Sequence, residues 1–299
     1  MKIAFIHNNR AFLPELAAYQ SFFSTQNIST CIVKYGEEKN SEADVYWYLM
    51  GFYPGSSHKG KLIIHEYSSA SVPPFRKLKD FLKSRLTPRP DFRLYLNEYV
   101  REQLSIHDEI PFGYRDMGIS EEFFHTKNEQ TKEYDFIYTG NLSDERRLTH
   151  LLKVFDEGAL KEHTILLLGK DVDRLARDYR HCKNIIFKSP VPWEEVAAHL
   201  ARAAYAINYV PNEEPFNAQT PTKFLEYAAM KIPVISTNYF WISEFQERYS
   251  GNYFFLKDDL SNMTWDRIVG FPYEFPNLQN WHWEERIKAS GVLEFLRQA

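Results

Sequence analysis

The sequence predicts an α/β protein of two Rossmann-like domains, each a doubly wound parallel sheet with helices on both faces. Three observations predict this fold. The chain has 299 residues, enough for two domains, and 44% of them are hydrophobic, as in globular proteins. Short runs rich in Ile, Val, Tyr and Phe alternate with segments of helical period, which is typical of parallel strands buried on both faces. The alternation begins again after a polar stretch at 128–133.

The first series predicts an amino-terminal domain over residues 1–128. Its elements are expected as strands over 2–7, 28–33, 44–49, 61–65 and 92–96, and helices over 14–25 and 98–104.

The second series is more regular and predicts a carboxyl-terminal domain over 129–278, followed by a tail over 279–299. Ligands of parallel sheets bind beyond the carboxyl ends of the strands, so we expect the site there, in a cleft that the two domains face. The elements are expected as strands over 135–139, 164–168, 184–188, 205–209 and 233–236, and helices over 147–155, 172–181, 193–203 and 222–230.

Composition excludes several classes of protein. With 36 basic and 40 acidic residues the net charge is -4, which argues against a nucleic-acid partner. The two cysteines, Cys31 and Cys182, are too few for a disulfide framework and are expected to be free thiols in a reducing compartment. The sequence contains neither an apolar run long enough to span a membrane nor a signal peptide, so a cytoplasmic protein is expected.

Motifs for metal, dinucleotide and ATP chemistry are also missing. We find no His-Glu-x-x-His and no Asp-x-Asp in a loop that follows a strand, so no catalytic metal is expected. Neither a Gly-x-Gly-x-x-Gly nor a phosphate-binding Gly-x-x-x-x-Gly-Lys-Ser/Thr follows any strand, which argues against hydride transfer and ATP hydrolysis.

The loop 138–147 joins a strand to a helix. Gly140 allows a close approach of the backbone, and Arg146 adds a forked cation beside the free N–H groups of the helix start. This combination suits a diphosphate. The alternative is an ordinary capped helix with Ser143 or Asp144 as the cap and solvated arginines.

The stretch 213–237 offers a second anion site. A polar loop enters a helix at Thr222, and the start of that helix carries Lys223 and Glu226. The lysine could bind phosphate, and the carboxylate could accept the hydroxyl hydrogens of a ribose. The alternative is a simple capping arrangement, since a helix dipole favours an acidic residue near its start.

Together these stretches resemble the carboxyl-terminal domain of GT-B glycosyltransferases of family 4, also called group 1. Residues 140–147 read Gly-Asn-Leu-Ser-Asp-Glu-Arg-Arg where the family has Gly-Arg-Leu-Ser-x-Glu-Lys-Gly. Residues 221–235 match Pro-x-Lys-x-x-Glu-Tyr-x-Ala-x-x-x-Pro-Val-Ile. The run that ends at Gly169 is similar to the family's strand and glycine turn, and 186–196 is similar to the segment that reads the base. The tail at 280–286 resembles the last helix, which crosses back to the first domain.

The resemblance implies a metal-independent transferase of the hexosyltransferase type, with a nucleotide diphosphate sugar as co-substrate and no other cofactor. Its acceptor would be a hydroxyl of a glycan in polysaccharide or glycoconjugate biosynthesis. Arg146 and Lys223 would neutralise the diphosphate, backbone N–H groups of Thr222 and Lys223 would cap it, and Glu226 would bind ribose. The remaining donor-side positions implied are Gly140, Asn141, Gly169 and Val191.

The chain departs from the family at two positions. The first glutamate of the family's Glu-x7-Glu motif is replaced by Ala218, and the nearest candidates are Glu213 and Glu214. Asn141 stands where the family has arginine. These departures leave open whether the anomeric configuration is retained or inverted. They also keep two alternatives: a non-catalytic GT-B module that binds glycan or nucleotide, and a sugar-nucleotide epimerase on the same fold.

In the first, acceptor-side domain, His65 and Glu66 end a strand. The family has a histidine at a comparable position, and an inverting enzyme needs a general base for the acceptor hydroxyl. The alternative is a hydrogen-bonded histidine and a solvated glutamate.

The segment 75–86 is a basic amphipathic helix that could lie on anionic lipid at the inner membrane face, with a lipid-linked acceptor. The alternative is a surface helix whose apolar stripe packs on its own sheet.

Overall fold

The computed structural model describes residues 1–8, 13–51, 53–54, 60–69, 75–127, 131–214 and 216–299. The chain divides into two compact units. Unit 1 comprises Met1–Gly118 and Asn280–Ala299, and unit 2 comprises Ile119–Gln279.

Unit 1 is built on a six-stranded sheet in the order β2-β1-β3-β4-β5-β6, and every recorded strand pair is parallel. The chain therefore reverses its direction of winding between β1 and β3. The elements of unit 1 are β1 (Lys2–His7), α1 (Pro14–Thr25), β2 (Ser29–Lys34), β3 (Val45–Leu49), β4 (Leu62–Tyr67), α2 (Arg76–Leu86), β5 (Phe92–Tyr95), α3 (Glu98–Leu104), β6 (Phe112–Tyr114), α11 (Trp283–Ala289) and α12 (Val292–Gln298), with a 3-10 turn at Glu38–Ser41.

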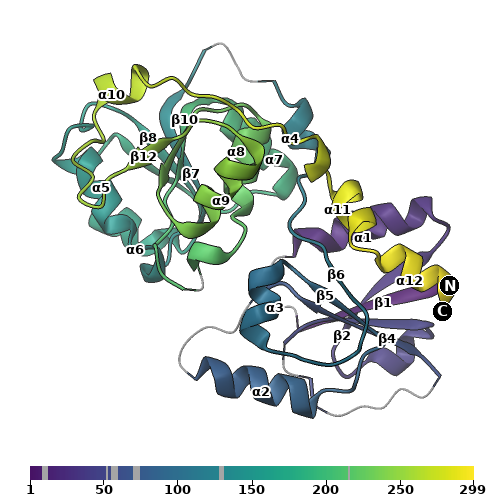
Figure 1. Cartoon of the computed structure of the whole chain (residues 1–299). Helices are drawn as coiled ribbons and strands as arrows, with labels where there is room; N and C mark the ends of the chain where they lie inside the picture. The colour runs from purple at the N-terminus through teal and green to yellow at the C-terminus, as the bar shows by residue number, and fades with distance from the viewer. Residues whose placement is uncertain (9–12, 52, 55–59, 70–74, 128–130, 215) are drawn as a thin grey trace. The chain divides into compact units, whose positions relative to one another are not determined.

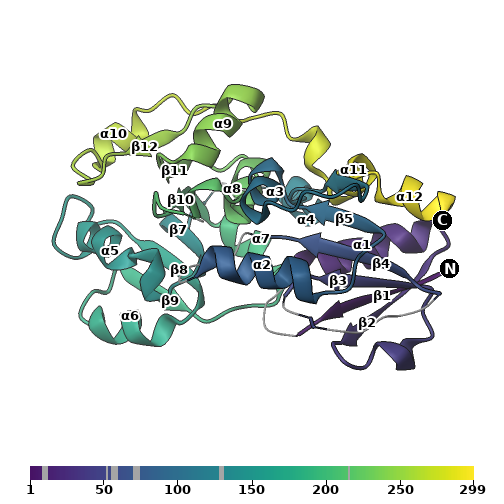
Figure 2. The same cartoon turned by 60° about the horizontal axis from the view of Figure 1, so that its bottom comes forward.

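One face of this sheet is covered by α1 together with the two last helices of the chain. Figure 1 and Figure 2 show α11 and α12, in yellow, beside α1, and the two termini lie close together. Aromatic rings fill the layer between sheet and helices: Tyr19 of α1 lies 5.2 Å from Phe5 and 4.7 Å from Trp47, measured between ring centroids. The end of the chain is thus part of the core of the first unit.

Unit 2 contains a second six-stranded parallel sheet in the order β12-β11-β10-β7-β8-β9. Read from β9, this is the strand order of dinucleotide-binding folds, with the reversal between β7 and β10. The elements of unit 2 are α4 (Glu121–His125), β7 (Tyr134–Asn141), α5 (Leu148–Asp156), β8 (Ile165–Lys170), α6 (Val172–Asp178), β9 (Ile185–Lys188), α7 (Trp193–Ala201), β10 (Ala203–Asn208), α8 (Thr222–Ala229), β11 (Val234–Thr237), α9 (Phe240–Tyr249), β12 (Phe254–Leu256) and α10 (Trp265–Val269), with 3-10 turns at Asp144–Arg146 and Phe216–Ala218.

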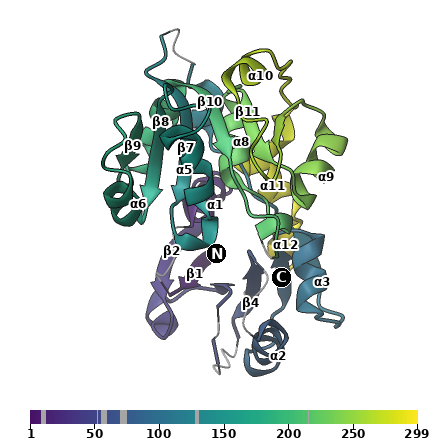
Figure 3. The same cartoon turned by 90° about the vertical axis from the view of Figure 1, so that its left-hand side faces the viewer.

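The helices of unit 2 cover both faces of its sheet. Figure 3 shows α5 and α6 on one side of the strands, and α8 and α9 on the other. The apolar side chains of α5 and α6 form one buried cluster with the strands and with Met263 and Ile268 of the α10 region. This is the doubly wound arrangement that the alternating pattern predicts, and the predicted fold is confirmed in both units.

Most predicted elements lie within two residues of the observed ones, but several elements were not predicted. The three-residue strands β6 and β12 are too short to show a period. Both cysteines are free thiols, as expected.

The boundaries between the units follow Gly118 and Gln279, whereas the sequence predicts domain boundaries after 128 and 278. The segment between 118 and 128 contains α4, whose Phe123 packs against Trp193 with ring centroids 5.4 Å apart. Of the polar stretch predicted at 128–133, residues 128–130 lie outside the described residues, and 131–133 precede β7 within unit 2, so the change of unit comes earlier in the chain.

Candidate functional site

The candidate site lies at the carboxyl edge of the unit 2 sheet, beside β7 and β10. The chain reverses its direction of winding between these two strands. Ligands of this strand order bind at that reversal point. The helix α8 is joined to the end of β7 by Tyr227, whose hydroxyl lies 2.9 Å from both the backbone nitrogen and Oγ1 of Thr139. The backbone N–H of Thr139 is the donor in the first of these contacts. The two stretches that the sequence singles out therefore meet here.

Two glycines keep the backbone close together at the end of β7. Gly140 has a φ of +126°, which favours glycine, and open space where a side chain would stand. Gly169 is its partner in β8, and a Cβ added there would lie 1.6 Å from the carbonyl oxygen of Gly140. Asn141 turns its side chain inward on the loop, since its Oδ1 accepts the backbone N–H of Ser143 at 2.9 Å.

Two cations face aromatic rings at this edge. The guanidinium of Arg146 lies 4.6 Å from the ring centroid of Phe216, and Lys223 Nζ lies 3.9 Å from that of Tyr138. Burial, and then the charge of Arg146, hold the pKa of Lys223 well below its usual range. Within the described part of the chain neither cation forms an ion pair. A bound anion would raise the pKa of Lys223 again, because a negative charge beside the ammonium group favours its charged form.

Glu226 lies deeper than the sequence implies. Its side chain is buried, and burial raises the pKa of the carboxyl to about 8, with Lys223 lowering it and Glu122 of α4 raising it. At neutral pH most of this group is protonated, so it can donate as well as accept. Its role toward a ribose stays a prediction, as do those of Thr222, at the half-buried start of α8, and Val191, in the loop after β9.

The capping alternatives are not supported by the structure. Among the residues that the structure describes, no side chain caps α5 or α8, and α5 begins after Arg147, which has a left-handed conformation with a φ of 52°. Ser143 and Asp144 instead open the short 3-10 turn that carries Arg146.

The position of the missing family glutamate is a buried alanine. Ala218 ends the 3-10 turn Phe216–Ala218. Upstream, Glu213 forms an exposed ion pair with Arg147, with an N–O distance of 2.8 Å. Glu213 is therefore held toward the start of α5, on the same side of the sheet edge as Arg146.

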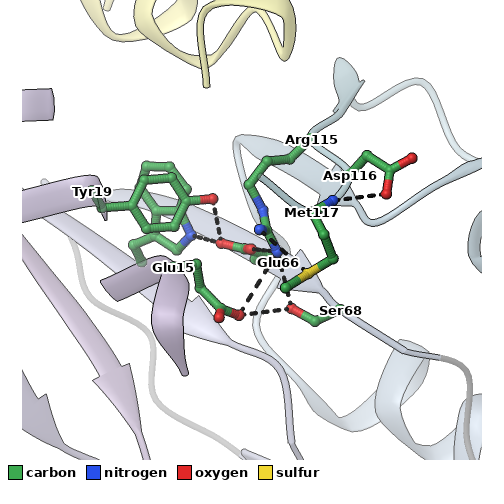
Figure 4. A network of polar contacts seen from close by, with 8 residues as sticks. Glu15, Tyr19, Glu66, Ser68, Arg115, Asp116 and Met117 are labelled. Atoms are coloured by element: carbon green, nitrogen blue, oxygen red, sulfur yellow. Dashed lines mark hydrogen bonds and ion pairs between the residues drawn. The ribbon is translucent and has the colours of Figure 1, made fainter. Parts of the chain in front are cut away.

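In unit 1, Glu66 belongs to a buried network that the sequence analysis missed (Figure 4). Its Oε1 pairs with Arg115 Nη2 at 2.7 Å, and its Oε2 accepts hydrogen bonds from Tyr19 at 3.0 Å and Trp47 at 2.8 Å. A second buried carboxylate, Glu15, lies 3.7 Å from the same guanidinium nitrogen. The alternative of a solvated Glu66 is wrong.

His65 is buried as well, with its Nδ1 3.4 Å from the hydroxyl of Tyr67. Burial, and next the charge of Arg93, lower the pKa of His65 to about 3. A general base works best when its pKa lies near the working pH, so this environment disfavours His65 as the base. The assignment of His65 and Glu66 as acceptor-side base stays a prediction.

The basic segment 75–86 forms α2, and its apolar stripe faces outward. Phe75 is 75% exposed, and Leu78 and Phe81 are each more than half exposed, whereas Asp80 is buried. The alternative in which the stripe packs on the sheet is therefore wrong. Among the described residues, no helix combines the length and apolarity needed to cross a membrane.

Comparison with known structures agrees with this fold. HepE of Anabaena, solved with UDP and glucose, superposes with a TM-score of 0.68 at 10% identity over 100% of both chains. AviGT4, a glycosyltransferase involved in avilamycin A biosynthesis, gives 0.59 at 12% identity over 99% of this chain and 95% of its own. The UDP-GlcNAc 2-epimerase of Methanocaldococcus jannaschii gives 0.58 at 12% identity over 100% of both chains. At these identities the likeness establishes the fold, which is GT-B.

The arrangement of two parallel-sheet units is that of the GT-B class. Residues 133–264 match the family model described as Glycosyl transferases group 1, and this match lies within unit 2. No curated protein matches the chain by sequence. The resemblance seen in residues 140–147 and 221–235 is therefore confirmed.

Proposed function

We propose that the protein transfers a sugar from a nucleotide diphosphate sugar to a hydroxyl acceptor without a catalytic metal. The observation that carries the proposal is the pair of cations at the reversal point, Arg146 and Lys223, each held on an aromatic ring. As the glycosidic bond breaks, negative charge builds on the leaving diphosphate. Fixed cations in a partly desolvated site stabilise that charge without reorganisation.

The glycines support the same proposal. With no side chain on Gly140, a diphosphate could approach the backbone at the end of β7. Glu226, one helical turn after Lys223, would meet the ribose either as hydrogen-bond donor or as acceptor. HepE and the archaeal epimerase were solved with uridine nucleotides, so UDP-sugars are the first donors to test.

The test is a turnover assay on the whole chain with UDP-glucose and UDP-GlcNAc, with and without a hydroxyl acceptor. We expect release of UDP that depends on the acceptor and survives excess EDTA. Complete loss of activity in EDTA, restored by magnesium or manganese, would contradict electrostatic catalysis by side chains alone.

A second candidate is a sugar-nucleotide epimerase, favoured by the likeness of the whole chain to the archaeal epimerase. It predicts that UDP-GlcNAc is isomerised without any acceptor. A third, favoured by Ala218, is a binding module. It predicts nucleotide binding with neither UDP release nor isomerisation.

For the acceptor, we propose a glycan carried on lipid, in polysaccharide or glycoconjugate biosynthesis at the inner membrane face. The support is α2, which exposes Phe75, Leu78 and Phe81 and whose sequence between 75 and 86 holds five basic residues and one acidic residue. Such a helix buries its apolar face among lipid headgroups while its cations attract anionic lipid.

The protein should sediment with anionic vesicles at low salt and less so at high salt, because salt screens the attraction. The double variant Phe75→Ser/Phe81→Ser should stay in solution. Phe240→Ser, which removes an equally exposed ring from unit 2, is the matched control and should still sediment. If wild type ignores anionic vesicles at low salt, the acceptor is not presented on a membrane by this helix.

A further inference from the structure

Three side chains with metal-binding atoms meet in unit 2, away from the donor-site residues. They are Asp156, which ends α5, and His181 and Cys182, which precede β9. His181 Nε2 and Cys182 Sγ each lie 3.0 Å from Asp156 Oδ1, and the ligand atoms of all three residues lie within 4.8 Å of one another.

These separations are close to those that a zinc ion imposes. Bonds of about 2.0–2.3 Å at tetrahedral angles keep nitrogen, oxygen and sulfur ligands about 3.3–3.6 Å apart. The two 3.0 Å separations would have to open by a few tenths of an ångström, and the widest pair, within 4.8 Å, would have to close by up to about 1.2 Å, which the exposed side chain of His181 allows. Imidazole, carboxylate and thiolate are the three ligand types that zinc uses in proteins.

The two segments that supply the ligands are tied together by Asn184. Its Nδ2 lies 2.9 Å from the carbonyl oxygen of Phe155, 3.0 Å from that of Lys161 and 3.1 Å from that of His163. Asp156 follows Phe155 directly, so this amide fixes the backbone on both sides of the cluster. Outer-shell hydrogen bonds that hold the ligands in place reduce the entropy that is lost when a metal binds.

The cluster also has access to solvent. The side chain of His181 is 61% exposed and that of Asp156 is 26% exposed, so a water molecule can reach the fourth position. The cluster lies at the amino edge of the sheet, where β8 and β9 begin, and the donor-site residues lie at the carboxyl edge. An ion here would not touch the reacting groups.

We propose that Asp156, His181 and Cys182 bind one zinc ion, with water as the fourth ligand. On binding, the thiol releases its proton to solvent and the imidazole carries its remaining proton on Nδ1. The ion's two positive charges then balance the thiolate and the carboxylate. Zinc would join the end of α5 to the start of β9 and stabilise unit 2.

The test is zinc titration of the full, untagged chain against a chromophoric chelator, with cobalt as a spectroscopic substitute. We expect one equivalent of zinc to bind, and cobalt to give the near-ultraviolet absorption of a thiolate–metal bond. Cys182→Ser and His181→Ala should each weaken zinc binding at least tenfold and abolish or alter the cobalt spectrum. His181 is exposed, so its replacement should leave the fold intact, which circular dichroism would verify.

The matched controls are Cys31→Ser, which removes the other thiol, and His125→Ala, which removes another exposed histidine. Both should bind zinc and cobalt as wild type does. If zinc binding and the cobalt spectrum are the same in Cys182→Ser and His181→Ala as in wild type, or if no equivalent binds, the cluster is only a hydrogen-bonded turn. Lys223→Gln should leave zinc binding unchanged, which separates this site from the donor site.

Discussion

The two units carry charge at the carboxyl edges of their sheets in opposite ways. In unit 1 the guanidinium of Arg115 is buried between two carboxylates, Glu66 and Glu15, so each charge has a partner within the protein. In unit 2 Arg146 and Lys223 contact aromatic faces, and in the described chain neither is paired with a carboxylate.

The difference indicates what each edge is for. A buried ion pair is costly to break, because removing one partner leaves an uncompensated charge. A lysine whose pKa is lowered by burial and by a neighbouring guanidinium, as that of Lys223 is, is typical of sites that bind an anion. The comparison therefore favours a structural role for the network of unit 1 and supports the proposal that the edge of unit 2 binds the donor.

The largest effect should come from breaking the buried network. Arg115→Met leaves Glu66 and Glu15 buried without a cation, which should cost about 3–5 kcal/mol of stability. Urea denaturation measures the change, with Arg248→Met as control, since Arg248 is exposed and pairs with Glu244 of its own helix. A variant as stable as wild type would show that unit 1 does not depend on this ion pair.

Replacing the cations of unit 2 should weaken nucleotide binding and have little effect on stability, in contrast to Arg115→Met. Arg146→Gln and Lys223→Gln should each weaken binding of UDP by about 1.5–3 kcal/mol, or roughly tenfold and more, because a charge-assisted hydrogen bond is lost. The stability of the unliganded chain should fall little, since neither cation forms an ion pair with any residue that the structure describes. Calorimetry that gives wild-type affinity for both variants would remove the donor site from this edge.

The pH dependence of stability should be specific to Glu226. Its pKa is about 8 in the folded chain, above the ordinary value of 4.5, so the folded state holds this proton more tightly than the unfolded state. Stability from this group is then present below pH 4.5 and is lost as pH rises to 8, at up to about 1.4 kcal/mol per pH unit. Glu226→Gln should flatten that slope. An unchanged slope would show that the carboxyl titrates normally.

The smallest effect should come from the exposed pair of Arg147 and Glu213. Glu213→Gln should change stability by only about 0.2–1 kcal/mol, because solvent screens an exposed ion pair. A loss as large as that of Arg115→Met would contradict the contrast between buried and exposed charge. Thermal denaturation of the two variants side by side makes the comparison.

The hydrophobic periodicity of the sequence by itself predicts the alternating strands and helices of both units. The strand that ends at Gly140 and the helix that starts at Thr222 were predicted because buried parallel strands and amphipathic helices each leave a regular pattern. The alternation of such elements also implied a ligand site beyond the carboxyl ends of the strands, and hence the edge that carries Arg146 and Lys223. Such hydrophobic patterns lie within short, contiguous segments, so one sequence is enough to show them.

The tertiary structure alone decided which distant side chains meet. Arg115 and Glu66 are 49 residues apart, and Asp156 and Cys182 are 26 apart, so neither pair leaves a periodic signal. The stripe of α2 predicts one apolar face, but only packing shows that this face is uncovered. Contacts of this kind depend on how helices and sheets pack together, because packing brings together side chains that local backbone preferences cannot relate.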